Sequence, residues 1–390
     1  MIIMLFETGC ALVGVSVVGC FVTSETRTIR RKIRRVLQAN EVKASARSVR
    51  RQGTAYKAQI GLSYELTARE FQRYLPLLEQ ALSAKIRFQE LPGSLCSLLI
   101  GFAPFKEQMR YDPSLTDGLA VPLYSPFGIK WLRFDDETSC HMLLGGATRM
   151  GKSVFLRLLA AHLIHATDGA IRVLFVDHKV SDVWAFRNLP QVTVAETSGE
   201  VRVFLQDILQ LAHDRKDKLK QAGDVVDVKE YRKKYPGDPM EPIFVIFDEY
   251  GRFADDDHIQ AMVIELAETA GYLDIHLVIS AQRPDAKDVL KPRIKANIVT
   301  RMSFATYDET NSKITLDIPD AAHIGKIQGR AILVDGFPDL VQVPYISTDE
   351  VIKLTERWRK NYEQPRPDGI EIPEALPRFV SGPVGNPDLS

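Results

Sequence analysis

Residues 142–166 read MLLGGATRMGKSVFLRLLAAHLIHA, and this stretch decides the fold. Within it, GATRMGKS at 146–153 fits the pattern GxxxxGK[ST]. A short apolar run, typical of a strand, precedes the glycine-rich loop, and a longer run typical of a helix follows it. Strand, loop and helix is the arrangement in which a loop backbone wraps around phosphate groups. The stretch therefore predicts a P-loop at the start of a helix.

Each position of this loop has an expected role. Gly146 and Gly151 allow backbone conformations that point N–H groups at phosphate oxygens, and the helix N-terminus adds partial positive charge. We expect Lys152 to pair with the β- and γ-phosphates of ATP, and Ser153 to ligate Mg²⁺. The other loop residues are expected to meet the nucleotide through their backbone: Ala147, Thr148, Arg149 and Met150. The bulky side chains at 149 and 150 can then point outward, where Arg149 would contact nucleotide, a neighbouring subunit or solvent.

Polar residues end two further apolar runs. PIFVIFDE at 242–249 reads as a strand closed by two acids, the second half of a P-loop site. Asp248 is predicted to hold Mg²⁺, and Glu249 to orient and polarise the attacking water. IHLVISAQRP at 275–284 places Gln282 at the end of the next strand, where it would sense the γ-phosphate. The carboxyl ends of parallel strands line the ligand crevice of such sheets, so these residues should converge.

The order of apolar runs predicts an α/β fold. From about residue 117 to 348, short β-branched runs alternate with helical stretches, which implies a mostly parallel sheet covered on both faces. Residues 55–116 alternate strand-like and helix-like segments and read as a small α/β subdomain, in which Thr67 is a plausible N-cap. Residues 349–390 contain one short helix and a tail rich in proline and glycine, which reads as extended.

The N-terminus predicts a membrane anchor. Residues 2–23 carry a single charge, Glu7, and a helix of this length would span roughly 33 Å. No basic residue precedes the run, whereas ten Lys and Arg follow between 27 and 51. We therefore expect residues 1–24 to cross the cell membrane once, with the C-terminal part in the cytoplasm, and the alternative is a buried N-terminal helix of a soluble protein. Residues 25–54 form a basic juxtamembrane segment that could hold anionic lipid or nucleic acid, and its position favours lipid.

Composition excludes several classes of protein. The chain is 45% hydrophobic and 26% charged, so disorder throughout its 390 residues is not expected. Its four cysteines form no CxxC motif or Cys/His cluster, which argues against a structural zinc site and against a secreted disulfide framework. The formal net charge is zero, so only local clusters can indicate partners.

Beyond these motifs, the chain resembles the FtsK/SpoIIIE family of DNA translocases between about 55 and 340. The most specific part combines IHLVISAQRP with IKANIVTRMSF, which are similar to the family's motor domain. Other segments that resemble the motor are GGATRMGKSVFLRLL, VIFDEYGRFADD, VDHKVSD at 176–182, and GKIQGRAIL. The resemblance implies a RecA-like P-loop ATPase core at 117–348, and residues 55–116 resemble the subdomain that precedes the motor.

The resemblance also implies an assembly and a substrate. Motors of this family work as rings, here a homo-hexamer, with each ATP site at a subunit boundary completed by a neighbour's arginine. Arg301 is the first candidate for that arginine and Arg293 the second. Double-stranded DNA would pass through the ring, and whether single strands also pass stays open. Large translocases of this family have several membrane spans and a C-terminal winged-helix module that reads DNA orientation, whereas one span and no such module are predicted here. This smaller layout resembles coupling proteins of conjugative elements in Gram-positive bacteria. Their partners would be a relaxase and channel proteins.

Two other functions remain open at this stage. Type VII secretion ATPases use similar domains to export protein, although usually several in tandem, and only one domain is evident here. The chain could also bind nucleotide as a scaffold with little turnover. The acid pair at 248 and 249 argues against a degenerate site, so an ATP-driven DNA translocase is the favoured interpretation.

Overall fold

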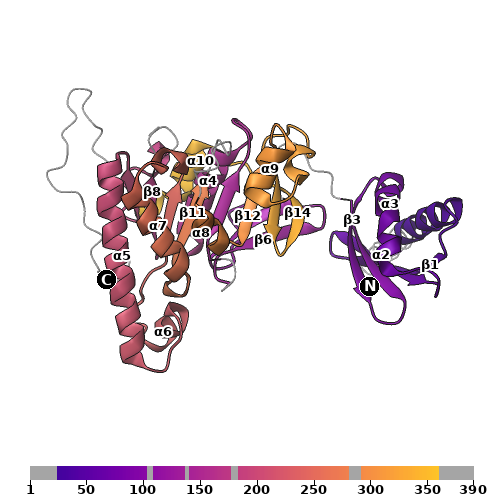
Figure 1. Ribbon diagram of the computed structural model, residues 1–390, viewed down its shortest axis with the longest axis horizontal. Helices are drawn as coiled ribbons and strands as arrows, with labels where there is room; N and C mark the ends of the chain where they lie inside the picture. Colours follow the sequence, from indigo (N-terminus) through magenta and orange to yellow (C-terminus); the bar gives the residue numbers. More distant parts are fainter. Residues whose placement is uncertain (1–23, 103–108, 137–139, 177–182, 281–290, 360–390) are drawn as a thin grey trace, which may run out of the picture. The chain divides into compact units, whose positions relative to one another are not determined.

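The computed structural model describes residues 24–102, 109–136, 140–176, 183–280 and 291–359 (Figure 1). The chain divides into two compact units. The N-terminal unit comprises Met1–Phe105 with Tyr124–Lys130, and the C-terminal unit comprises Lys106–Leu123 with Trp131–Ser390. Each unit has hydrophobic clusters of its own, so each is described separately below.

The N-terminal unit is built on a four-stranded antiparallel sheet in the order β1-β2-β4-β3. Alternate residues of each strand are apolar, and these pack on one face against a helix at 24–39 and against α3. Thr67 caps the next helix as predicted, in a capping box with Glu70. The elements are β1 (Ala44–Gln52), β2 (Ala55–Leu62), α2 (Ala68–Phe71), η1 (Gln72–Tyr74), α3 (Leu75–Leu82), β3 (Lys85–Leu91) and β4 (Leu95–Gly101).

The basic stretch 25–54 folds as part of this unit, whereas the sequence pattern predicted a segment outside it. Ile29, Ile33 and Leu37 lie one helical turn apart and are buried in the sheet's core. Strand β1 pairs with β2 along most of its length. The predicted domain boundary between residues 54 and 55 is therefore wrong, because it separates β1 from β2, which form one hairpin. The sequence signal was missed because basic residues mask the apolar period of three and four.

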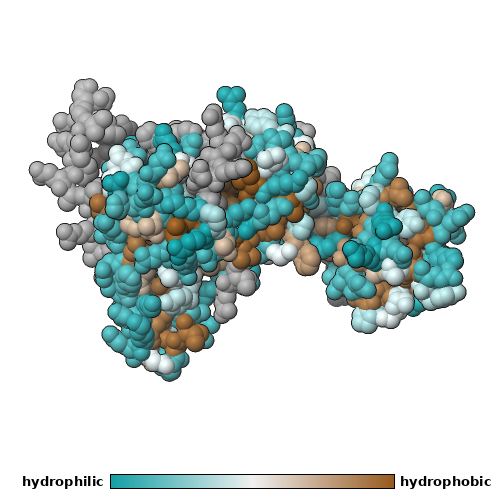
Figure 2. Space-filling view, in the orientation of Figure 1, coloured by the Kyte–Doolittle hydropathy of each residue, from teal (hydrophilic) through white to brown (hydrophobic). Residues whose placement is uncertain are grey.

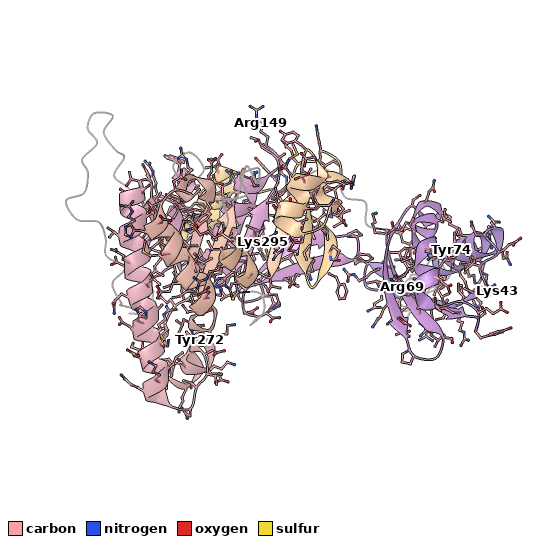
Figure 3. The ribbon with its side chains drawn as sticks, viewed as in Figure 1. Lys43, Arg69, Tyr74, Arg149, Tyr272 and Lys295 are labelled. Atoms are coloured by element: carbon pink, nitrogen blue, oxygen red, sulfur yellow. The ribbon has the colours of Figure 1, made fainter. Side chains whose placement is uncertain are left out.

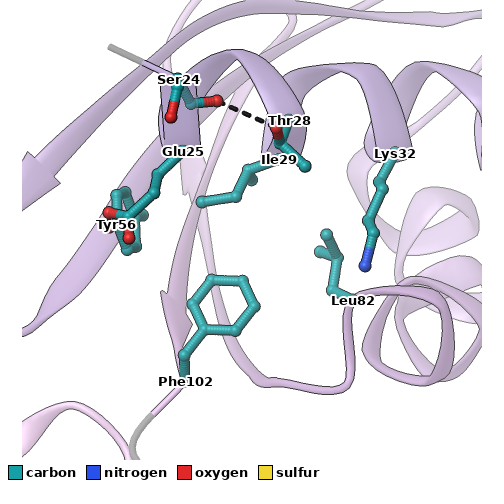
Figure 4. Close-up of a pocket in the computed structure, with 8 residues that line it drawn as sticks. All are labelled: Ser24, Glu25, Thr28, Ile29, Lys32, Tyr56, Leu82 and Phe102. Atoms are coloured by element: carbon teal, nitrogen blue, oxygen red, sulfur yellow. Dashed lines mark hydrogen bonds between the residues drawn. The ribbon is translucent and has the colours of Figure 1, made fainter. Parts of the chain in front are cut away.

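Between the helix 24–39 and the sheet lies a cavity of about 380 Å³ (Figure 4). Apolar side chains of Ile29, Leu82 and Phe102 line it together with polar ones. The hydroxyl of Tyr56 donates a hydrogen bond to Glu25, and burial raises the pKa of this tyrosine.

The C-terminal unit is built on a ten-stranded sheet in the order β6-β5-β14-β13-β12-β7-β11-β10-β8-β9, of which the end of β5 and the start of β6, within Tyr124–Lys130, belong to the N-terminal unit. Neighbours from β12 to β9 pair in parallel, and β13 and β14 continue the sheet as antiparallel strands. The strands are β5 (Ala120–Ser125), β6 (Gly128–Arg133), β7 (Met142–Gly145), β8 (Arg172–Val176), β9 (Val192–Ala195), β10 (Ile243–Phe247), β11 (Ile275–Ser280), β12 (Thr300–Phe304), β13 (Arg330–Asp335) and β14 (Phe337–Gln342).

Helices cover both faces of this sheet (Figure 1), which is why its central strands are apolar without alternation. Two hydrophobic clusters follow, one around α4 and the other around α5 and α7. Hydrophilic residues dominate the outward side of α5 in Figure 2. The helices are α4 (Lys152–Ala166), α5 (Ser198–Ala222), α6 (Val228–Lys234), α7 (Asp257–Thr269), α8 (Pro292–Asn297), α9 (Glu309–Leu316) and α10 (Thr348–Leu354), with short turns η2 (Trp184–Phe186), η3 (Tyr250–Phe253), η4 (Gly271–Leu273), η5 (Asp320–Ala322) and η6 (Glu356–Trp358).

A buried charge network closes the amino-terminal edge of the parallel strands. Arg215 of α5 is 4% exposed and donates to the carbonyls of Leu273, at 2.6 Å, and Glu241, at 2.5 Å. Asp274 accepts from Arg232 at 2.5 Å and hydrogen-bonds His276 at 2.9 Å. Although burial opposes ionisation of Asp274, its partners His276 and Arg232 hold the pKa of this carboxyl far below its usual range. The network pairs charges that would otherwise be costly to bury.

The predicted anchor and tail fall largely outside the described residues. Of residues 1–24 the structure describes only Ser24, and within the described ranges no helix combines the length and apolarity needed to span a bilayer. The single short helix predicted after 349 corresponds to α10, which starts at Thr348 and has a capping box formed by Ser347 and Glu350. The proline-rich residues from 360 onward lie outside the described part.

Candidate nucleotide-binding site

The loop between β7 and α4 has the predicted strand, loop and helix arrangement. Gly146 and Gly151 both adopt positive φ, at 129° and 122°, in a region that side chains disfavour. A Cβ atom on Gly146 would lie 2.7 Å from that of Phe304, so the loop also leaves no room for a side chain there. Gly151 is the N-cap of α4, and the helix begins at Lys152. Both glycines are therefore required by backbone geometry.

Lys152 lies at the centre of this loop with only 6% of its surface exposed. Its ammonium group donates hydrogen bonds to the carbonyl oxygens of Gly146 and Ala147. A buried cation beside the first turn of a helix makes a site of positive potential, which suits a phosphate chain. Ser153 follows in the same turn and is half-buried. The residues present thus fit a triphosphate with its Mg²⁺.

The remaining loop residues anchor the loop or face solvent. The amide of Ala147 donates to the carbonyl of Ala305 at 2.9 Å. Met150 packs against the core, and its carbonyl accepts from the amide of Gly329 at 2.9 Å. Thr148 and Arg149 are exposed, and Figure 3 shows the Arg149 side chain projecting away from the body of the unit. Of the two bulky side chains for which an outward direction was allowed, Arg149 takes it and Met150 packs inward.

Asp248 and the P-loop lie at the same edge of the sheet. In the parallel register, Phe247 of β10 pairs with Ile279 of β11, which pairs with Leu143 of β7. One strand thus separates the two halves of the site, a spacing of about 10 Å. Phe244 and Ile246 share a core with α4, so alternation along β10 turns Asp248 toward that helix. Asp248 is 6% exposed, and its amide donates to the carbonyl of Val176 at 3.2 Å.

Glu249 follows where the strand ends. Its φ of −143° and ψ of 77° lead the chain into η3, and the side chain is half-buried. The next residue fixes this turn, because the Tyr250 hydroxyl donates to Gln260 at 3.0 Å inside the protein. Burial raises the pKa of Tyr250, so its phenol stays a hydrogen-bond donor. A turn at this point is what the prediction that both acids serve one edge requires.

Other predicted site residues are only partly placed. Gln282 and residues 177–182 lie outside the described residues. Arg301 of β12 donates to the carbonyls of Ile298 and Lys295 and pairs with Asp317. Arg293 is exposed and forms a two-bond pair with Glu268, at 2.9 Å for each bond. Both arginines thus have partners within the chain, and their role toward a neighbouring subunit stays a prediction.

Sequence reasoning missed the residues that support the loop from behind. The Phe304 side chain lies under both loop glycines, and Thr315 of α9 lies against Gly145 so closely that a Cβ there would clash. Ser280, at the end of β11, is fully buried, and its hydroxyl has no hydrogen-bond partner among the described residues. The doubled glycine at 145 and 146 was the available signal that another element approaches the loop.

Comparison with known proteins agrees with this geometry. The model of the FtsK/SpoIIIE family matches residues 120–315. A DNA translocase FtsK from Caldanaerobacter subterraneus is 29% identical over 236 residues, which are 57% of this chain and 32% of that protein. One from Treponema pallidum is 28% identical over 287 residues, 69% of this chain and 35% of that protein. The chain thus matches about a third of the length of these relatives.

Solved structures share the fold. The conjugation coupling protein TcpA of pCW3, in a monomer form with ATPγS, has a TM-score of 0.60 at 20% identity and covers 84% of this chain and 99% of its own. The cytoplasmic domain of the type VII secretion ATPase EccC from Thermomonospora curvata has a TM-score of 0.55 at 19% identity, covering 66% of this chain and 34% of its own. The predicted α/β fold with a mostly parallel sheet is confirmed.

Proposed function

Since the chain belongs to the FtsK/SpoIIIE family, we propose that it is an ATP-driven DNA translocase and the coupling protein of a conjugative element. One observation carries the proposal: the P-loop with buried Lys152 and the acid pair at 248 and 249 lie at the same edge of one parallel sheet. That arrangement supports phosphoryl transfer to water, for which positioning and charge stabilisation supply most of the catalysis.

Each residue has a part in this chemistry. The loop amides and Lys152 would hold the triphosphate, while Ser153 and Asp248 would hold Mg²⁺. Bound Mg²⁺ neutralises charge that develops on the phosphate oxygens. Glu249 orients the attacking water and polarises it as a general base. Gln282 would report the state of the γ-phosphate to the strand that separates the two halves of the site.

The proposed working form is a homo-hexameric ring in which each site lies at a subunit boundary. A neighbour's arginine would complete the site, with Arg301 the first candidate and Arg293 the second. Ring closure would then have to exchange their present partners, Asp317 and Glu268, for phosphate. The ion pair of Arg293 is the more exposed of the two, so breaking it would cost less free energy than breaking that of Arg301.

DNA is favoured over polypeptide as the substrate because of the extent of the structural match. TcpA covers 84% of this chain and matches along 99% of its own, whereas the secretion ATPase matches along 34% of its own chain. A protein that couples DNA to a membrane channel would need a relaxase and channel proteins as partners. Protein export is the second candidate, because EccC has the same fold.

The proposal includes a membrane anchor at residues 1–24, with the rest of the chain in the cytoplasm. It is supported by the apolar run 2–23 and by the basic residues that follow it. Expression of the chain without residues 1–24 should move it from the membrane fraction to the soluble fraction. Retention at the membrane after this deletion would assign the attachment to the basic residues instead.

The deciding experiment measures ATP turnover by the full chain with linear duplex DNA, single-stranded DNA or no nucleic acid. We expect duplex DNA to raise turnover at least tenfold, and Glu249→Gln to abolish the stimulated rate while leaving ATP bound. Turnover that ignores DNA and responds to a secreted substrate would favour protein export. Background turnover in all three conditions would contradict the proposal and favour a nucleotide-binding scaffold.

A further inference from the structure

The N-terminal unit is strongly basic although the whole chain is neutral. Residues 24–102 contain fifteen Lys and Arg and six Asp and Glu, so this segment carries nine more positive than negative charges. The rest of the chain must carry the compensating negative charge. A local excess of this size creates a positive potential that attracts polyanions.

Five of these fifteen cations lie on one face of the four-stranded sheet, and six others lie on the helix 24–39. The helix 24–39 and α3 cover the opposite face, as their shared core with Ala58, Ile60 and Leu98 shows. Strand alternation therefore leaves the odd-numbered residues of β2, β3 and β4 on the face that no helix covers, although Pro126 and Phe127 lie against its end at Gly101 and Arg87. We call this face the open face. Its polar residues are Arg47, Ser48, Arg50, Lys57, Gln59, Lys85, Arg87, Gln89 and Ser97.

Two rows cross the open face from strand to strand. In one row Arg50 pairs with Lys57, which pairs with Leu99, which pairs with Arg87. The adjacent row is Ser48, Gln59, Ser97 and Gln89, of which Ser97 is buried and the other three lie nearer the surface. Three strand spacings make each row about 14 Å long. Cations beside hydroxyl and amide groups are the side chains that contact phosphate and sugar in DNA complexes.

The first row includes a pair that is unfavourable for the fold alone. Arg50 and Lys57 lie directly opposite each other on neighbouring strands, and like charges in that position destabilise a sheet. Neither Arg50, Lys57 nor Arg47 pairs with a carboxylate in the described part of the chain. None of the strand residues that alternation places on the open face is acidic. An external polyanion would relieve this repulsion.

The Arg47 side chain also lies on the open face, in space left free by Gly61. A Cβ atom on Gly61 would collide with the guanidinium of Arg47, so the glycine leaves the space in which this side chain lies across β2. Arg47 stands at a register shift in β1, between Ala46 and Ser48. Such a bulge re-aims a side chain relative to the regular pleat. The cation is therefore placed on this face by the backbone.

From these observations we propose that the open face binds the phosphate backbone of double-stranded DNA without reading its sequence. The inference rests on the proposed function and adds to it a DNA contact outside the ATPase domain. Duplex DNA carries one charge about every 1.7 Å of its axis, so a 14 Å row faces several phosphates. Lipid is the less suitable partner, because the apolar side chains on this face, Leu91, Leu95 and Leu99, are half-buried rather than exposed for insertion.

The test compares two triple variants of the full chain that remove the same charge. Arg47→Gln, Arg50→Gln and Lys57→Gln alter the open face, while Arg31→Gln, Arg34→Gln and Arg35→Gln alter positions on the helix that covers the other face. Binding of a fluorescent 40-base-pair duplex is measured in ATPγS at several salt concentrations. The ATPγS-bound state keeps the ATPase part of the protein the same in every sample.

We expect the open-face variant to bind DNA roughly tenfold to a hundredfold more weakly than wild type near physiological salt. The slope of log affinity against log salt should fall by about three, one for each lost phosphate contact. The helix variant should stay within about threefold of wild type. Equal weakening in both variants would assign the effect to overall charge and overturn the inference.

Vesicles that contain anionic phospholipid provide the second arm. If the open-face variant lost vesicle binding while keeping DNA binding, the face would belong to lipid and the inference would be wrong. Wild-type protein that fails to bind DNA at any salt concentration would instead count against the proposed function.

Circular dichroism of both triple variants should match wild type. A double variant that keeps Arg50 and carries only Arg47→Gln and Lys57→Gln should retain part of the affinity that the triple variant loses.

Discussion

The two edges of the parallel sheet in the C-terminal unit handle buried charge in opposite ways. At the amino edge, Arg215, Asp274 and Glu241 are held by fixed partners of the same chain. At the carboxyl edge, the buried ammonium of Lys152 lies on carbonyl oxygens, beside helix amides that suit an anion. The first edge stabilises the fold, and the second is arranged for a ligand that brings negative charge.

The largest expected effect tests the carboxyl edge of the sheet, where Lys152 is predicted to be essential for ATP turnover. Lys152→Ala should lower ATP turnover at least a hundredfold, because it removes the cation that stabilises phosphate charge. Turnover and binding of a fluorescent ATP analogue check this. The control is Lys220→Ala, which removes an exposed cation of α5 and should leave turnover within twofold. Near-normal turnover in the Lys152 variant would remove the assignment of the loop.

The amino edge is tested by Arg215→Met. The change leaves the carbonyls of Leu273 and Glu241 without their donor and unbalances a buried network, which should cost about 3 to 5 kcal/mol of the free energy of unfolding. Urea denaturation without nucleotide measures it. Lys218→Met removes a half-exposed cation nearby and should cost about 1 kcal/mol or less. Equal losses in the two variants would show that the edge is not a stabilising network.

The smallest effect concerns pH. Burial lowers the pKa of His141 to about 3, and its Nδ1 accepts the amide of Leu277 at 3.0 Å. The unfolded chain takes up a proton below about pH 6.5 while the folded protein does not, so this histidine lowers stability as the pH falls from 6.5 toward 3.

Between pH 7.5 and pH 5 this loss should amount to about 2 kcal/mol, and His141→Asn should remove it while keeping an acceptor for Leu277. Urea midpoints of both proteins at the two pH values test the difference. Burial also lowers the pKa of His162, to about 4, but both proteins retain that residue and its effect cancels. A pH dependence that is unchanged in the variant would place the lost stability elsewhere.

The sequence predicted the fold class and the local elements of the site because their signals are local. The glycines and lysine of the P-loop, the apolar strand before Asp248 and the N-cap at Thr67 depend on neighbours within a few residues. The placement of β11 between the two halves of the site could not be predicted, because strand order depends on pairing between distant segments.

The same reason explains what was missed. Arg215 lies in a helix with many charged residues, and only the packing of α5 over the strand ends makes it a buried residue. Residues 25–54 looked like a separate basic segment because their partners, β2 and the core of the small sheet, follow later in the chain. Charge alone did not distinguish a solvated tail from the face of a folded sheet.

The bond from the Gly329 amide to the Met150 carbonyl ties the phosphate loop to the start of β13. Gly151 lies close enough to Gly329 that a Cβ atom would touch its backbone, so the two segments have no slack between them. A shift of the loop during nucleotide exchange must either carry the β13–β14 hairpin with it or break a contact worth about 1 kcal/mol. We therefore expect a movement of the loop to be transmitted to the β13–β14 hairpin.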